Sequence, residues 1–280
     1  MIGVKHSGQL GDIIYSLPFL KSYISKNGHE KIVLFIPSDK KANRAKGLKH
    51  IGGDLMISVG MFNFIKPLLV CQNFIFDVIY MPEKEIPEGV LDLDLIRAGI
   101  LNLSAGNIRS YYFKIFGLMD LCKGAWLEIP DAEEESVYDV IIGRSTRYLN
   151  KSIDYSVIND CNLKVGYIGS DYEFSVFSST YPGLICDRIE VRTGLSAAQL
   201  ILSSKIYIGN QSLFFALAEG LNHPRLLESF EPVPNVVPTP GNSGAFISTV
   251  GMMSMLAEKF PSKFNSERYA FIEPDYILSL

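Results

Sequence analysis

The chain has 280 residues, of which 48% are hydrophobic, so it can bury the core of one large domain or of two domains of ordinary size. Its formal net charge of −4 and its pI of about 5.6 provide no general attraction to nucleic acid or to an anionic membrane. We therefore expect no nucleic-acid partner. A local basic groove and peripheral contact with a membrane surface stay open.

Cysteine and histidine usage argues against a metal site. The four cysteines are far apart and form no C-x-x-C pair, and no histidine has the spacing of a metal ligand. We therefore expect no metal and no disulfide framework. We also expect a cytoplasmic location, because the N-terminus meets polar residues too early for a signal peptide.

The most apolar stretch, residues 59–81, is interrupted by Lys66, Pro67 and Asp77. Its apolar runs are well short of the roughly 18 residues of a membrane span, so we predict a core helix followed by a strand.

Short β-branched segments alternate with longer helix-like segments, which is the pattern of βαβ units around a parallel sheet. The strands predicted in the first half are 2–5, 31–36, 74–80 and 90–95. The helices predicted there are 12–26, 62–70 and 109–116. The strands predicted in the second half are 138–143, 164–168, 188–191, 205–209 and 225–228. Its predicted helices are 155–161, 172–178, 196–204 and 212–221.

An acidic, apolar-poor stretch at residues 129–136 separates the two halves. We predict an α/β fold with two Rossmann-like lobes whose parallel sheets face a central cleft. The N-terminal lobe, on the acceptor side, would span residues 1–132, and the lobe that binds the nucleotide would span 133–260. The C-terminal segment, 261–280, would cross back to the first lobe.

The loop after the first strand reads Ser7-Gly8-Gln9-Leu10-Gly11-Asp12. In an open α/β sheet, ligands bind outside the carboxyl ends of the strands. Gly8 and Gly11 let the backbone approach a ligand, and the next helix offers free N–H groups to a phosphate. The spacing matches neither G-x-G-x-x-G nor a Walker loop. Taken alone, it favours Asp12 as a helix cap over Asp12 as a catalytic group.

Two loops of the second half carry further candidates. Arg144 and Arg147 follow the strand at 138–143, where guanidinium groups would pair with a diphosphate; an ordinary solvated loop is the alternative. Gly209 is followed by Asn210, Gln211 and Ser212, which open a helix and would form a second anion site at its N-terminus; a plain capped turn is the alternative.

Two acidic positions also end strands. Gly169 precedes a helix in which Glu173 would reach ribose hydroxyls, unless it only complements the helix dipole. Glu228 ends another strand, with a solvated carboxylate as the alternative. Asp92-Leu93-Asp94 has the letters of a cation-binding pair, but it lies in an alternating apolar run and is predicted to be strand.

Together these loops resemble the heptosyltransferases, glycosyltransferase family nine, whose members have the GT-B fold of two Rossmann lobes. The resemblance at the start lies in Gly11-Asp12 followed by Leu17-Pro18, as in the Gly-Asp…Leu-Pro opening of the family. In that family this Asp deprotonates the acceptor hydroxyl. The resemblance therefore implies that Asp12 is the catalytic base, that Arg144 and Arg147 stand for the basic diphosphate loop, and that Glu173 is the ribose carboxylate.

The second lobe departs from the family pattern of Gly-Asn-Asp-Ser-Gly followed by His. Gln211 replaces the acidic residue, Leu213 the Gly and Ala216 the His. These replacements remove groups that hold the sugar and the phosphates, so ADP-heptose is not predicted as the donor.

The resemblance implies a metal-independent, inverting glycosyltransferase with a nucleoside diphosphate sugar as donor substrate and no further cofactor. A glycan or another hydroxyl compound would be the acceptor, in surface glycan synthesis. A nucleotide-sugar epimerase or hydrolase is one alternative. A catalytically silent nucleotide-sugar-binding protein is another, favoured by the replacements around Gln211. The acidic pI disfavours a DNA-modifying glucosyltransferase.

Overall fold

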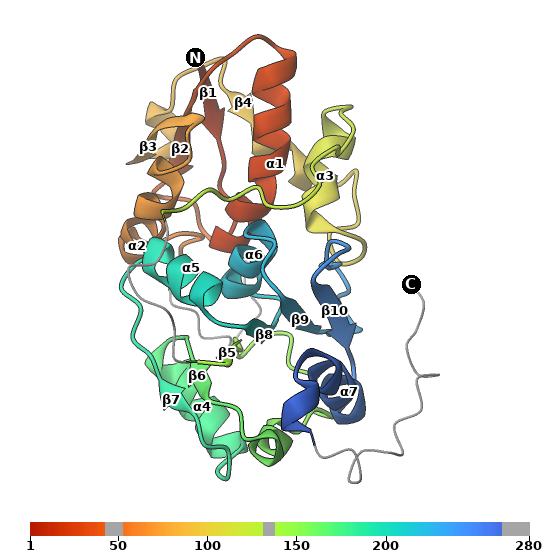
Figure 1. Ribbon diagram of the computed structural model, residues 1–280. Coiled ribbons are helices and arrows are strands. Elements are labelled where there is room, and N and C mark those ends of the chain that lie inside the picture. The colour runs from red at the N-terminus through yellow and green to blue at the C-terminus, as the bar shows by residue number, and fades with distance from the viewer. Residues whose placement is uncertain (43–52, 131–137, 265–280) are drawn as a thin grey trace.

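The structure is a computed structural model that describes residues 1–42, 53–130 and 138–264. Its two lobes each contain one parallel sheet (Figure 1). The sheet of the first lobe has the order β3-β2-β1-β4, formed by β1 (Ile2–Lys5), β2 (Ile32–Pro37), β3 (Ile75–Met81) and β4 (Leu91–Asp92). Its helices are α1 (Leu10–Lys26), α2 (Val59–Val70) and α3 (Ile108–Ile115), with short 3-10 helices η1 (Glu83–Glu85) and η2 (Leu93–Arg97).

The sheet of the second lobe has the order β10-β9-β8-β5-β6-β7. Its strands are β5 (Val140–Gly143), β6 (Val165–Tyr167), β7 (Asp187–Arg188), β8 (Ile206–Asn210), β9 (Arg225–Glu228) and β10 (Ser243–Phe246). Its helices are η3 (Tyr155–Cys161), α4 (Asp171–Thr180), α5 (Gly194–Ser203), α6 (Leu213–Gly220), α7 (Thr249–Lys259) and η4 (Pro261–Lys263).

The order of the strands reverses once in each sheet. In the first lobe the chain runs outward from β1 to β2 and β3, and then returns to place β4 on the other side of β1. In the second lobe it runs from β5 to β6 and β7, and then places β8 on the other side of β5. Ligands of open α/β sheets bind at such reversals, at the carboxyl ends of the strands. The fold thus marks two positions: the loops after β1 and β4, and those after β5 and β8.

One buried hydrophobic cluster spans both lobes. It joins α1 and α2 of the first lobe to α5 and α6 of the second, and the latter two helices lie between the sheets in Figure 1. Along β5, Ile141 belongs to this shared cluster, whereas Val140 and Ile142 belong to a second cluster on the other face of the sheet. Both faces are covered, which explains the continuous apolar sequence of the strand. The apolar interface holds the lobes against each other.

Most predicted elements are present with end shifts of a few residues, but three differ. The strand predicted at 90–95 ends at Asp92, because the Asp92 carboxylate accepts a hydrogen bond from the Asp94 amide (2.9 Å) and turns the chain into η2. The helix predicted at 155–161 is the 3-10 helix η3. Strand β10 was not predicted, because its sequence, Ser-Gly-Ala-Phe, lacks the β-branched residues typical of strands.

The predicted lobe boundary, between residues 132 and 133, lies outside the described residues, as do residues 265–280 of the predicted C-terminal segment. The described start of that segment contains η4, and Phe264 packs against the core of the second lobe. The apolar stretch 59–81 forms α2 and β3, as predicted. Within the described ranges, no helix has both the length and the apolar composition needed to cross a membrane.

Candidate functional site

Asp12 lies in the first turn of α1, directly after the loop that follows β1. Its Oδ2 atom accepts a hydrogen bond from the Gln9 amide (3.1 Å), so it takes part in the capping of α1. The same oxygen contacts Nη2 of Arg97 at 2.6 Å, and the Asp12 side chain is 19% exposed. The cap that the spacing favoured is therefore present. It uses only one of the two carboxylate oxygens, Oδ2.

Arg97 and Asp94 come from η2, directly after β4, on the other side of the strand-order reversal. Asp94 accepts hydrogen bonds from the Ser7 amide (3.0 Å) and the Ser7 hydroxyl (2.6 Å), and it contacts Arg97 at 3.4 Å. Burial raises the pKa of Asp94, but nearby His6, the Ser7 hydrogen bonds and Arg97 together hold it below its usual value. The loop that carries Asp12 is thus attached to the end of β4.

His6 and Tyr112 support this loop from inside. The Gly8 amide donates to Nδ1 of His6 (2.9 Å), so that nitrogen carries no proton and the neutral ring is protonated on Nε2. The Nε2 atom lies 2.8 Å from the Tyr112 hydroxyl, which donates to the Asp12 carbonyl. Burial, with a contribution from the Arg97 charge, lowers the pKa of His6 to about 4. The neutral imidazole is therefore a fixed part of the loop.

In the second lobe, Asn210 at the end of β8 holds the loop after β5. Its side chain accepts a hydrogen bond from the Ser145 amide (3.0 Å) and donates to the carbonyls of Ser145 (2.9 Å) and Arg147 (2.6 Å). Tyr148 in this loop has φ of 54°, in the left-handed region that disfavours bulky residues, and such strain persists where the surroundings fix it. Asn210 therefore positions the backbone of the loop that presents Arg147.

Arg144 is bound to another side chain within the protein. Its guanidinium makes two hydrogen bonds with Glu228, from Nε to Oε2 (2.6 Å) and from Nη2 to Oε1 (2.8 Å), and both side chains are buried. Tyr155 donates to the same carboxylate (2.9 Å) and lies against the guanidinium. The expectation that Arg144 binds a diphosphate has no support in this geometry, and Glu228 is not the solvated carboxylate considered above. The pair anchors the loop that carries Arg147, whose side chain is partly exposed.

Gln211 connects the two lobes. Its Nε2 atom donates to the Val233 carbonyl (2.7 Å) and to Oδ1 of Asn235 (2.7 Å). Asn235 in turn donates to the Leu103 carbonyl of the first lobe (3.0 Å), which fixes the orientation of both amides. The buried Oε1 atom of Gln211 has no hydrogen-bond partner among the described residues.

The loops of the two lobes meet at the N-termini of α1 and α6. A Cβ atom on Gly11 would lie 3.8 Å from the backbone of Leu213, so the two helix ends lie close together. Ser212 is the N-cap residue of α6. The structure therefore brings Gly11, which directly precedes Asp12, close to the Ser212–Leu213 start of α6.

Gly169 and Glu173 lie after β6, at the start of α4. Oε2 of Glu173 accepts a hydrogen bond from the Ser170 amide (2.9 Å), and the Glu173 amide donates to the Ser170 hydroxyl (3.3 Å), which together form a capping box. A Cβ on Gly169 would collide with Tyr167 (2.9 Å). The capping alternative for Glu173 is thus present, and its ribose contact stays a prediction.

Sequence reasoning missed Asp94, Arg97 and Asn235. A signal for the first two was available: they follow the fourth strand as Asp12 follows the first, and a reversal of strand order would bring both ends together. Asn235 lies in a Pro-rich segment, 232–240, whose composition indicates only a rigid loop.

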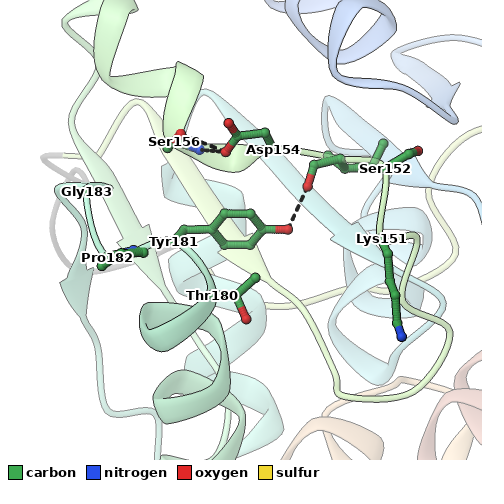
Figure 2. Close-up of a pocket in the computed structure, with 9 residues that line it drawn as sticks. Lys151, Ser152, Asp154, Ser156, Thr180, Tyr181, Pro182 and Gly183 are labelled. Carbon is green, nitrogen blue, oxygen red and sulfur yellow. Dashed lines mark hydrogen bonds between the residues drawn. The ribbon is translucent and has the colours of Figure 1, made fainter.

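A hollow of about 450 Å³ lies elsewhere in the second lobe (Figure 2). Its walls come from residues 151–156 and 180–183, and none of the predicted site residues lines it. Two of its hydrogen bonds join lining residues to each other: Tyr181 donates to the Ile153 carbonyl, and Asp154 accepts from Ser156. In the part of the chain that the structure describes, no group of three His, Cys, Asp or Glu side chains has the arrangement of a metal site.

No family model matches the sequence, and a search of curated proteins found no match. Solved structures do match. The E. coli ADP-heptose LPS heptosyltransferase II superposes with a TM-score of 0.57 at 16% identity, over 95% of this chain and 99% of that one. E. coli heptosyltransferase WaaC, with ADP-2-deoxy-2-fluoro heptose, gives 0.56 at 10% identity, over 92% and 99%. The dodecameric iron-containing glycosyltransferase TibC of enterotoxigenic E. coli gives 0.53 at 12% identity, over 86% and 63%.

These likenesses extend over nearly the whole chain and establish its fold. The expected GT-B-like arrangement of two parallel-sheet lobes is confirmed, and so is the resemblance to heptosyltransferases at the level of structure. The roles of individual residues rest on the geometry described above.

Proposed function

We propose that this chain is a metal-independent glycosyltransferase that moves a sugar from a nucleoside diphosphate donor to an acceptor hydroxyl, with inversion at the sugar carbon. One observation carries the proposal. In the fold of the heptosyltransferases, the loop with Asp12 meets the N-terminus of α6, beside the loop with Arg147. This proximity supports the proposal that the Asp12 carboxylate acts beside groups suited to hold a diphosphate.

In this proposal Asp12 accepts the proton of the acceptor hydroxyl, which is worth about 10²–10⁴ in rate. The acceptor oxygen bonds to the sugar carbon as the bond from that carbon to the diphosphate breaks. Arg147 and the N–H groups at the start of α6 stabilise the departing diphosphate, and such electrostatic stabilisation is commonly the larger contribution. Arg144 acts only by supporting the loop, through Glu228.

The structural neighbours suggest the class of substrate. WaaC was solved with ADP and with an ADP-heptose analogue, and heptosyltransferase II is named for ADP-heptose and LPS. A nucleoside diphosphate sugar and a surface glycan are therefore the substrates we propose, in the cytoplasm. The sugar itself stays open, because Ala216 is fully buried and apolar where the family has a His.

The test compares Asp12→Asn and Arg147→Ala with the unaltered protein, using a panel of ADP-, UDP- and GDP-sugars. Nucleoside diphosphate affinity is measured by calorimetry, and turnover is measured as nucleoside diphosphate release. Asp12→Asn should bind the nucleoside diphosphate within about twofold of the unaltered protein and lose at least about 100-fold in turnover. Arg147→Ala should instead weaken nucleotide binding.

Near-normal turnover of Asp12→Asn would remove Asp12 as the base. Binding without any donor consumption by the unaltered protein would favour the catalytically silent alternative, which the replacements at Gln211 and Ala216 motivate. Consumption of the donor with no acceptor present would point to the epimerase or hydrolase.

A further inference from the structure

The two carboxylate oxygens of Asp12 have unequal surroundings. Oδ2 accepts from the Gln9 amide (3.1 Å) and from Nη2 of Arg97 (2.6 Å). Oδ1 receives no hydrogen bond from the residues that the structure describes. The two donors on Oδ2 come from different segments of the chain, and together they hold that oxygen in place.

Arg97 is itself held in place. Its second terminal nitrogen lies 3.4 Å from Asp94, whose carboxylate is fixed by two hydrogen bonds from Ser7. The Arg97 side chain is only 28% exposed, although it carries a charge. Burial lowers the pKa of Arg97, but Asp12, Tyr112 and Asp94 together raise it above its usual value, so the guanidinium keeps its proton throughout.

The space for this contact depends on Gly8. A Cβ atom there would come within 2.5 Å of Nη2 of Arg97 and 2.8 Å of Oδ2 of Asp12. The loop thus passes close to the ion pair, and hydrogen bonds from Gly8 to His6 and from Ser7 to Asp94 hold it there. The Asp12 carboxylate is thus held in place through Oδ2, whereas Oδ1 has no hydrogen bond from the described residues.

We infer that Arg97 is a positioning residue for the base of the proposed transferase: by holding Oδ2, it aims Oδ1 of Asp12 at the acceptor hydroxyl. This inference rests on the proposed function. The acceptor proton moves to Oδ1, while the electron pair of the broken bond leaves with the nucleoside diphosphate. Arg97 gives up no proton and touches neither substrate.

The expected effect is large because proton transfer needs a heavy-atom distance of about 2.6–3.2 Å. A misplacement of about 1 Å can cost on the order of 10²-fold in rate. Donor binding depends on the second lobe, so its affinity should not follow the loss of Arg97. A binding role for Arg97 would instead raise KM and leave kcat unchanged.

The experiment uses the full chain with Arg97→Ala, Arg97→Lys and the control Lys21→Ala. Lys21 also makes a 2.6 Å ion pair, with Glu128, and is 34% exposed. It lies nine residues after Asp12 on α1, about 13 Å along the helix. Nucleoside diphosphate release is measured with the donor that the unaltered protein consumes, with and without millimolar guanidinium chloride.

Arg97→Ala should lose about 10–100-fold in kcat, with donor KM and nucleoside diphosphate affinity within about twofold of the unaltered protein. Added guanidinium should restore part of the kcat of Arg97→Ala and none of that of Asp12→Asn. Arg97→Lys should keep the charge but recover only part of kcat, because ammonium lacks the planar fork. Lys21→Ala should match the unaltered protein.

Unchanged kcat in Arg97→Ala, or a change confined to KM, would overturn the positioning role. The proposed function would still stand in that case if Asp12→Asn is inactive. If Arg97→Ala fails to fold, a folded Arg97→Lys with full kcat would overturn the role, and one with reduced kcat and unchanged KM would support it. An unaltered protein that consumes no donor would end both proposals.

Discussion

At the scale of single residues, Gly8 has tight surroundings in the Asp12 loop. Its position is not one of positive φ, so the requirement for glycine is spatial. His6, Arg97 and Asp12 each contribute an atom within 2.8 Å of the place where a Cβ would stand. The imidazole and the ion pair are all fixed by other bonds, so none can move aside without losing a contact.

Gly8→Ala should therefore reduce both stability and turnover. We expect a loss of about 1–3 kcal/mol in the free energy of unfolding, the usual result of overpacking, measured by urea denaturation. Turnover should fall by more than about tenfold, because the new methyl group would displace Asp12 or Arg97. Gly60→Ala is the control, since the nearest atom to its new Cβ would be the Ser58 hydroxyl at 3.9 Å. Equal stability and turnover in the two variants would show that the loop accommodates a methyl group at position 8 without displacing Asp12 or Arg97.

At the scale of elements, residues 233–235, which follow β9, form a strap between the lobes. Gln211 of the second lobe donates to both ends of the strap, at Val233 and Asn235. On the other side, Gly106 and Ile108 of the first lobe donate backbone hydrogen bonds to it, each of 2.9 Å. The residue that replaces the acidic group of the family thus holds the strap, and a carboxylate could not do so, because both of its partners are acceptors.

Gln211→Glu should loosen the strap. A carboxylate would face the Val233 carbonyl and Oδ1 of Asn235 with no proton to donate, at a cost of about 1–3 kcal/mol. Hydrogen exchange should become faster at Gly106 and Ile108, whose amides donate to the strap. The same change at Gln199, a half-exposed residue of α5, should leave exchange at these amides unaltered. If the Gly106 amide of Gln211→Glu exchanged as slowly as in the unaltered protein, the strap would be held without the hydrogen bonds of Gln211.

Strands and helices with strong periodicity were predictable from the sequence, whereas the contacts between them were not. The apolar run of β5 and the Gly-Asp opening of α1 are local patterns, and they indicate the lobes and the position of Asp12. Arg97 lies 85 positions from Asp12, and no local pattern records that contact. Asp92 shows a second kind of contact that the sequence pattern does not reveal. Its side chain accepts a hydrogen bond from the Asp94 amide, which ends β4, whereas the alternation of apolar residues predicted that the strand continues.

At the scale of the whole molecule, each lobe contains one buried neutral histidine among the residues that the structure describes. His6 supports the Asp12 loop of the first lobe, and His223 follows α6 in the second, near the Ser204 hydroxyl (3.3 Å). Burial lowers the pKa of both to about 4, with further contributions from Arg97 at His6 and from Arg225 and Lys259 at His223. An unfolded chain would bind these protons near pH 6.5.

Stability should therefore fall as the pH is lowered from about 6.5 to about 4. In that window the unfolded chain binds two protons that the folded chain excludes, so the free energy of unfolding decreases by up to about 2.7 kcal/mol per pH unit. The change ends below about pH 4, where both states are protonated. Asp94 does not offset it, because a lowered carboxyl pKa affects stability only below its ordinary value near 4.

Urea denaturation at intervals between about pH 4.5 and pH 7 measures the slope. His223→Gln cannot take up a proton, so its slope should fall to that of one proton, about 1.4 kcal/mol per pH unit, whatever its stability at neutral pH. His29→Gln, on the surface segment after α1, should keep the slope of two protons. A His223→Gln slope equal to the unaltered one would mean that the folded protein does not hold the pKa of His223 below its ordinary value.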